Sequence, residues 1–205
     1  MAGRVAGKIK LQTVDELLGV PEIAGTQEIE LGRIHAFPNH PFKVLDDERM
    51  DMLVESIREN GILNPVIVRP DKNGDYEMIS GHRRLHAAGI VGLSKIPAIV
   101  KEMSDDEAII KMVDANIQRE EIMPSEKAFA YKMKLEAMKR TAGRPTKENA
   151  CHNGTHLRSD QELALQVGDS ARSIQRYIRL TELIPELLEC IDNKKLGLVI
   201  AVDLS

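Results

Sequence analysis

Aromatic residues and cysteines are scarce in this sequence of 205 residues, which has no tryptophan, three tyrosines, three phenylalanines and two cysteines. So few rings argue against a platform that binds single-stranded nucleic acid by base stacking. Two cysteines in a chain without the apolar core of a signal peptide are expected to be reduced. Long apolar runs are missing as well, so no segment is expected to cross a membrane. We therefore expect a cytoplasmic protein.

Positive charge is not in excess over the whole chain, whose formal net charge is −4. This balance argues against a protein that coats nucleic acid non-specifically. The segment 140–182 differs, because it contains seven basic and five acidic residues. Positive charge is thus concentrated in one part of the chain, as expected for a DNA-binding unit.

The most informative segment covers residues 79–89, which read ISGHRRLHAAG. A short strand at 77–80 is predicted to run directly into Gly81, and a helix with Arg83 and Arg84 in its first turn follows. Backbone N–H groups at a helix start, together with two guanidinium groups, suit a phosphate, and a glycine lets the backbone approach it closely. The alternative interpretation is a tight strand-to-helix turn with solvated arginines.

The segments around this loop predict a small mixed α/β unit. An amphipathic helix is expected over 46–60, followed by two strands at 65–70 and 76–80 that form a hairpin around Asn73 and Gly74. A further strand is expected at 96–100. Ser104 and Glu107 then form a capping box for a helix that runs into residues 116–119, which read NIQR.

The order of these motifs over residues 29–131, from GILNPVIVRP through YEMISGHRRLHAAGIVGLSKIPAIV to DANIQRE, resembles the N-terminal domain of the ParB family of DNA partition proteins. In that family this domain binds a nucleoside triphosphate, usually CTP with Mg²⁺. The resemblance implies an α+β fold that begins with a small ParB/sulfiredoxin-like domain. It also implies nucleotide contacts from six residues: Gly81, His82, Arg83, Arg84, Asn116 and Arg119.

Two departures from the family pattern concern hydrolysis. His82 and Ala115 replace glutamates that family members use around the triphosphate. A carboxylate is the group that would hold Mg²⁺ or orient an attacking water molecule. Glu120 and Glu121 lie nearby in the sequence and could substitute. We therefore expect nucleotide binding with, at most, slow CTP hydrolysis.

Residues 160–180 have the spacing of a helix-turn-helix. Ala164 lies where the two helices would cross, Gly168 lies in the turn and Ile174 anchors the second helix. The exposed positions of the second helix carry side chains suited to base edges and to phosphates. Those near base edges would be Arg172, Gln175 and Arg176, and those near phosphates Ser170, Ser173 and Arg179. The alternative is an ordinary helical hairpin with a solvated basic face.

The helix-turn-helix segment also resembles the ParB central domain, which reads a palindromic centromere-like site. The expected organisation is a flexible leader at 1–28, a nucleotide-binding domain at 29–120 and an all-helical DNA-binding domain at 121–205, with a hinge at 141–158. In the family such a leader contacts a ParA-type ATPase, which makes this ATPase an expected partner. The chain stops at Ser205 without the dimerisation segment that usually follows, so we expect a truncated protein.

The favoured hypothesis is a homodimeric, nucleoid-associated partition protein, a DNA clamp gated by CTP that segregates a plasmid, chromosome or mobile element. The alternative is a helix-turn-helix transcriptional regulator that does not use nucleotide. An enzyme of the sulfiredoxin type would need a cysteine directly after the loop glycine, where this chain has His82. Cys151, His152 and His156 lack the second paired cluster of a structural zinc site, so no metal is expected.

Overall fold

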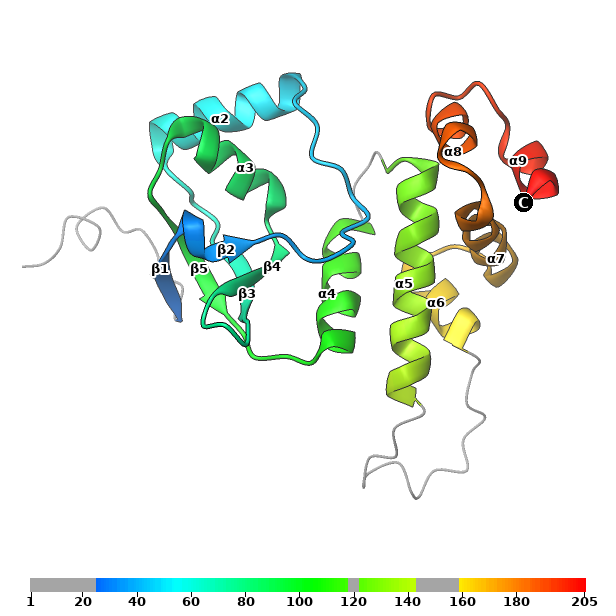
Figure 1. Cartoon of the computed structure of the whole chain (residues 1–205), viewed down its shortest axis with the longest axis horizontal. Helices are drawn as coiled ribbons and strands as arrows, with labels where there is room; N and C mark the ends of the chain where they lie inside the picture. The colour runs from blue at the N-terminus through cyan, green and yellow to red at the C-terminus, as the bar shows by residue number, and fades with distance from the viewer. Residues whose placement is uncertain (1–24, 118–121, 143–158) are drawn as a thin grey trace, which may run out of the picture.

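A computed structural model describes residues 25–117, 122–142 and 159–205 of the chain (Figure 1). The first stretch contains both strands and helices, and the other two are helical, which confirms the predicted α+β class. In chain order the elements are β1 (Thr26–Glu30), β2 (Ile34–His35), α2 (Glu48–Asn60), β3 (Val66–Pro70), β4 (Tyr76–Ser80), α3 (His82–Val91), β5 (Lys95–Val100), α4 (Asp105–Ile117), α5 (Pro124–Ala142), α6 (Ser159–Val167), α7 (Ala171–Arg179), α8 (Pro185–Asp192) and α9 (Leu198–Leu204). None of the helices in the described ranges is long and apolar enough to span a bilayer.

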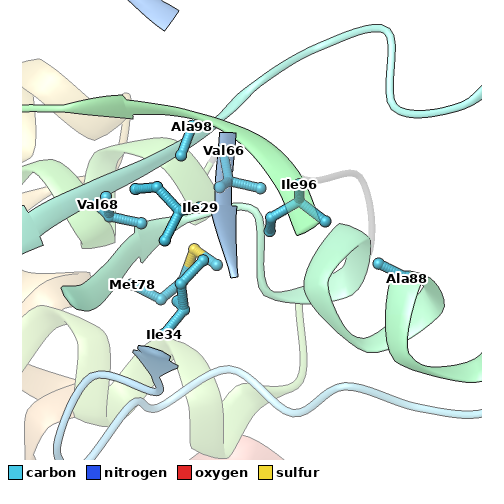
Figure 2. Packing of buried hydrophobic residues seen from close by; sticks show 8 residues of the cluster. All are labelled: Ile29, Ile34, Val66, Val68, Met78, Ala88, Ile96 and Ala98. Carbon is cyan, nitrogen blue, oxygen red and sulfur yellow. The ribbon is translucent and has the colours of Figure 1, made fainter. Parts of the chain in front are cut away.

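The five strands form one mixed sheet in the order β1-β5-β3-β4-β2. The pairs β1–β5 and β3–β4 are antiparallel, whereas β3–β5 and β2–β4 are parallel. Because strand side chains alternate between the two faces, Val66 and Val68 lie on one face and Ile67 on the other. The first face packs against Ala88 of α3 in the cluster that Figure 2 shows. The second face packs against α4.

The two edge strands were not expected from the sequence. Residues 26–28, which we had assigned to the leader, belong to β1, which pairs with β5 from Thr26–Ile99 to Glu30–Lys95. The only buried residue of β1 is Ile29, and β2 has only two residues, of which Ile34 is buried. A strand that buries only one side chain shows no alternation of apolar and polar residues, so the sequence does not reveal it. Its place in the sheet is set by pairing with a strand far away in the sequence.

Helix α5 contributes to three hydrophobic clusters. Ile191 of α8 and Ala201 of α9 pack with Ala128 of this helix. Its Ala130 packs with Met112 of α4 and Ile79 of β4, while the next residue, Tyr131, packs with Leu163 of α6 and Ile174 of α7. Figure 1 accordingly shows α5 between the sheet-containing unit and the helices α6–α9. Helix α5 extends to Ala142, so the first two residues of the hinge expected at 141–158 are helical. Residues 143–158 lie outside the described ranges.

Gly81 determines the turn that joins β4 to α3. Its φ is +114°, in the left-handed region that side chains other than glycine rarely adopt. A Cβ atom at this position would lie 2.7 Å from Cγ1 of Val66, which is fully buried in the sheet. A larger residue would therefore strain both the backbone and the core.

We expect the Gly81→Ala substitution to lower the free energy of unfolding by about 1–3 kcal/mol, because the native φ would become strained. Gly89→Ala is the matched control, since Gly89 lies within α3 and no atom would approach its Cβ within 4 Å. Alanine is the better helix former, so this control should leave stability unchanged or raise it by roughly 0.4–1 kcal/mol. Urea unfolding gives the free energy of unfolding of both variants. Equal changes in Gly81→Ala and Gly89→Ala would contradict the role of Gly81 in the turn.

Candidate functional site

A cavity of about 380 Å³ lies at the N-terminal end of α3. The sequence-predicted residues Gly81, His82, Arg83, Arg84 and Asn116 all line it, although Asn116 lies on α4 and more than 30 residues from the others. Two lining residues that the sequence did not single out, Arg49 and Leu53, come from α2. Arg119 lies outside the described residues, so its predicted place in the site is untested. The remaining lining residues are Ser80 and Ala115.

The two arginines of the loop have different environments. Arg84 donates hydrogen bonds from Nη1 to the carbonyl oxygens of Asn64 and Pro65, the latter at 2.8 Å, and its burial lowers the pKa of the guanidinium. It is therefore anchored on the segment that leads into β3. Arg83 Nη2 lies 3.5 Å from Asp47 Oδ1, and its side chain is 32% exposed. Arg83 is thus the less tightly anchored of the two loop arginines.

Arg49 and Arg83 also border a second cavity of about 660 Å³. This cavity extends to the start of α5, where Glu126 Oε1 accepts a hydrogen bond from the backbone N–H of Lys43 at 2.7 Å. The end of α8 and the residues after it contribute Asp192 and Lys194. Arg49 and Arg83 thus border a space that also reaches residues of the helical unit.

His82 is buried and packs against His40, with 3.7 Å between the ring centroids. His40 Nδ1 lies 2.7 Å from the carbonyl oxygen of Phe42, a geometry in which this nitrogen donates a hydrogen bond. From the sequence, His82 is expected to contact the nucleotide and to stand in place of a family glutamate, but its contact with His40 is not expected. A stacked pair formed by residues 42 positions apart has no local sequence signal.

The described lining residues of the smaller cavity include three arginines but no carboxylate. They therefore suit an anionic group, and they offer Mg²⁺ no hard oxygen ligand from an acidic side chain. Asn116 is buried, and its amide Nδ2 donates to the Met112 carbonyl oxygen of its own helix at 2.7 Å. Glu120 and Glu121, the two alternative carboxylates, lie outside the described residues.

Helices α6 and α7 form the predicted helix-turn-helix. Gly168 in the turn has φ +75°, and the hydroxyl oxygen of Ser170 caps α7 by accepting a hydrogen bond from the Ser173 N–H at 3.0 Å. Ile174 is fully buried, as expected for the residue that anchors the second helix. The opposite side of α7 exposes the four predicted long side chains, Arg172, Gln175, Arg176 and Arg179. Arg179 Nη2 also donates to the Ser205 carbonyl oxygen at 3.1 Å.

Comparison with known proteins finds one matching family model and several similar sequences. The family model described as the ParB N-terminal domain matches residues 15–117. The chromosome-partitioning protein Spo0J of Thermus thermophilus is 34% identical over 83% of this chain and 56% of its own length. A nucleoid occlusion protein of Listeria monocytogenes is 30% identical over 95% of this chain and 62% of its own length. This chain therefore spans less than two thirds of either relative.

A solved structure supports the same fold. The C-terminally truncated ParB of Caulobacter crescentus, crystallised as a complex with the centromeric parS site, aligns with a TM-score of 0.54 and 23% identity. The alignment covers 87% of this chain and 83% of the truncated protein. At this identity the similarity establishes the fold only.

The cap of α7 can be tested by two single substitutions. Ser170→Ala removes the hydroxyl oxygen that accepts from the Ser173 N–H, and we expect it to lower the free energy of unfolding by about 0.5–2 kcal/mol. Ser173→Ala keeps the donating N–H and should change stability by much less. Equal losses in thermal or urea unfolding would contradict the capping role of Ser170.

Proposed function

This chain belongs to the ParB family, and we propose that it is a DNA-binding partition protein whose N-terminal unit binds a nucleoside triphosphate, CTP by family resemblance. The observation that carries the proposal is the cavity at the start of α3. In it, the left-handed Gly81, the arginines of the loop and Asn116 of a distant helix meet around one space. Bound nucleotide would act as a conformational ligand that favours one state of a DNA clamp.

The charge of the cavity supports a triphosphate ligand. Arg49, Arg83 and Arg84 supply three positive charges beside the N-terminal end of α3, where the helix dipole also favours an anion. When bound, Mg²⁺ would be held mainly by phosphate oxygens and water. Because the described lining offers no carboxylate as a general base, we expect hydrolysis to be slow or absent.

The nucleotide site is tested by Arg83→Gln, which removes the less tightly anchored guanidinium of the loop but keeps a polar side chain. A charge-assisted hydrogen bond is worth about 1.5–3 kcal/mol, so CTP affinity should fall at least roughly tenfold. Arg58→Gln is the matched control, because Arg58 lies on α2 and pairs with Glu55 on the protein surface. Calorimetric titration with CTP and Mg²⁺ gives the affinities. Unchanged affinity in Arg83→Gln would contradict the assignment, as would no binding of any triphosphate at millimolar concentration.

For the DNA-binding unit we propose that α7 enters the major groove of double-stranded DNA. Arg172, Gln175 and Arg176 would lie near base edges, and Ser170, Ser173 and Arg179 near phosphates. Their exposure on one side of α7 supports this arrangement. One helix-turn-helix reads a half-site, so the functional unit would be a homodimer on a palindrome. A ParA-type ATPase is the further partner that the family resemblance implies.

A nucleotide-independent helix-turn-helix regulator is the alternative function. It is favoured by the hydrogen bond that holds Asn116 on its own helix and by the lack of a carboxylate in the described cavity lining. The two functions differ in one measurable respect. A regulator of this kind would bind DNA with the same affinity and the same lifetime whether or not CTP is present.

Base readout is tested by comparing Arg176→Ala with Arg179→Ala on a cognate palindrome and on a scrambled duplex. Loss of the base contact in Arg176→Ala should cost about 1–3 kcal/mol of binding free energy, and on the cognate duplex only. Loss of a phosphate contact at Arg179 should weaken both duplexes alike and reduce the salt dependence of binding. If both variants lose the same affinity on both duplexes in a salt-titrated assay, α7 does not read bases.

A further inference from the structure

Four side chains join α5 to the helix-turn-helix: Lys127 and Tyr131 of α5, Asp169 of the turn and Tyr177 of α7. We call them the α5–turn cluster. Lys127 Nζ lies 2.8 Å from Asp169 Oδ2, and the Tyr131 hydroxyl donates a hydrogen bond to the same oxygen. Lys127 and Tyr131 are one helical turn apart, so both reach the turn from one side of α5.

The cluster contacts α7 near both of its ends. Asp169 directly precedes Ser170, the residue that caps α7, and Tyr177 lies in the last turn of the helix. The Tyr131 and Tyr177 rings pack edge to face, with centroids 5.9 Å apart and planes at 84°. Lys127 Nζ lies 4.9 Å from the centroid of the Tyr177 ring and 5.5 Å from that of Tyr131. The ammonium group thus bridges the turn and the end of α7.

Burial distinguishes this cluster from an ordinary surface ion pair. Tyr131 is fully buried, and the side chains of Lys127 and Asp169 are 25% and 27% exposed. Although burial alone would raise it, the pKa of Asp169 is lowered, because Lys127 and Tyr131 both donate hydrogen bonds to the carboxylate. Burial and the neighbouring carboxylate raise the pKa of Tyr131, so its hydroxyl remains a donor at neutral pH.

We propose that the α5–turn cluster sets the sequence specificity of DNA binding by fixing the orientation of α7, although none of its members is among the residues assigned to base contacts. The inference rests on the proposed DNA-binding function. Base-edge hydrogen bonds tolerate displacements of only about 0.5 Å, so a small tilt of α7 would break them. Phosphate contacts from long arginine side chains tolerate such a tilt, because they depend mainly on charge.

The decisive variant is Tyr131→Phe, which keeps the buried ring and the charge of the protein but removes the hydroxyl that donates to Asp169. Asp169→Asn is the second variant, in case the first loses stability. Lys139→Met is a control for substitution on α5, because Lys139 is an exposed residue on the same helix, away from the turn. The complete chain is used throughout. The cognate duplex is a palindrome that the unsubstituted protein selects from a random library.

Affinities for the cognate and a scrambled duplex are measured at several salt concentrations, together with thermal unfolding and amide exchange in α7. We expect the ratio of the two affinities to fall roughly threefold to tenfold in Tyr131→Phe and in Asp169→Asn, while Tyr131→Phe changes scrambled binding less than about twofold. Amides of α7 should exchange faster than in the unsubstituted protein, and Lys139→Met should keep the ratio.

Two results would overturn the inference, and they are distinguishable. If both variants unfold at lower temperature but keep the affinity ratio, the cluster stabilises the fold without setting specificity. If the unsubstituted protein selects no duplex at all, the proposed DNA-binding function itself fails, and the inference fails with it.

Discussion

The packing of α5 in three hydrophobic clusters is the constraint on which the rest of the structure depends. Ala130 and Tyr131 are adjacent in the sequence, but Ala130 packs with residues of α4 and β4, whereas Tyr131 packs with residues of α6 and α7. Because protein interiors are closely packed, α5 cannot shift against one cluster without disturbing the others. The buried Lys134, which pairs with Asp114 of α4 at 2.5 Å, adds a polar contact on the side of α5 that faces the sheet unit. One helix therefore packs against both the sheet-containing unit and the helix-turn-helix.

Local features of the fold could be predicted from the sequence. The hairpin around Gly74, the left-handed Gly81 and the capping box of Ser104 and Glu107 each depend on residues a few positions apart. The helix-turn-helix has a comparable local signature in Gly168 and Ile174. Edge strands β1 and β2 could not be predicted, because each buries one side chain and pairs with distant partners. The division into a leader, two domains and a hinge remains a prediction, apart from the residues that belong to β1 and α5.

The residues of the candidate site could be predicted from the sequence, but most of their contacts could not. The sequence selected the loop residues and Asn116, and the structure brings them to one cavity. It could not indicate that Arg84 is anchored on the carbonyl oxygens of Asn64 and Pro65, or that His82 packs on His40. These contacts form between segments that are 19 to 42 residues apart, so no local pattern encodes them. The Arg84 contacts leave Arg83 as the less tightly anchored cation of the loop.

We propose that nucleotide and DNA bind to two separate sites of this chain, and that α5 connects the units that carry them. If CTP favours one state of the DNA clamp, it changes the affinity for DNA, and DNA then changes the affinity for CTP by the same factor. The most direct test is calorimetric titration of the chain with CTP, alone and in the presence of a saturating cognate palindrome. The account predicts that CTP affinity differs at least about fivefold between the two titrations. Equal affinities in the two titrations would contradict it.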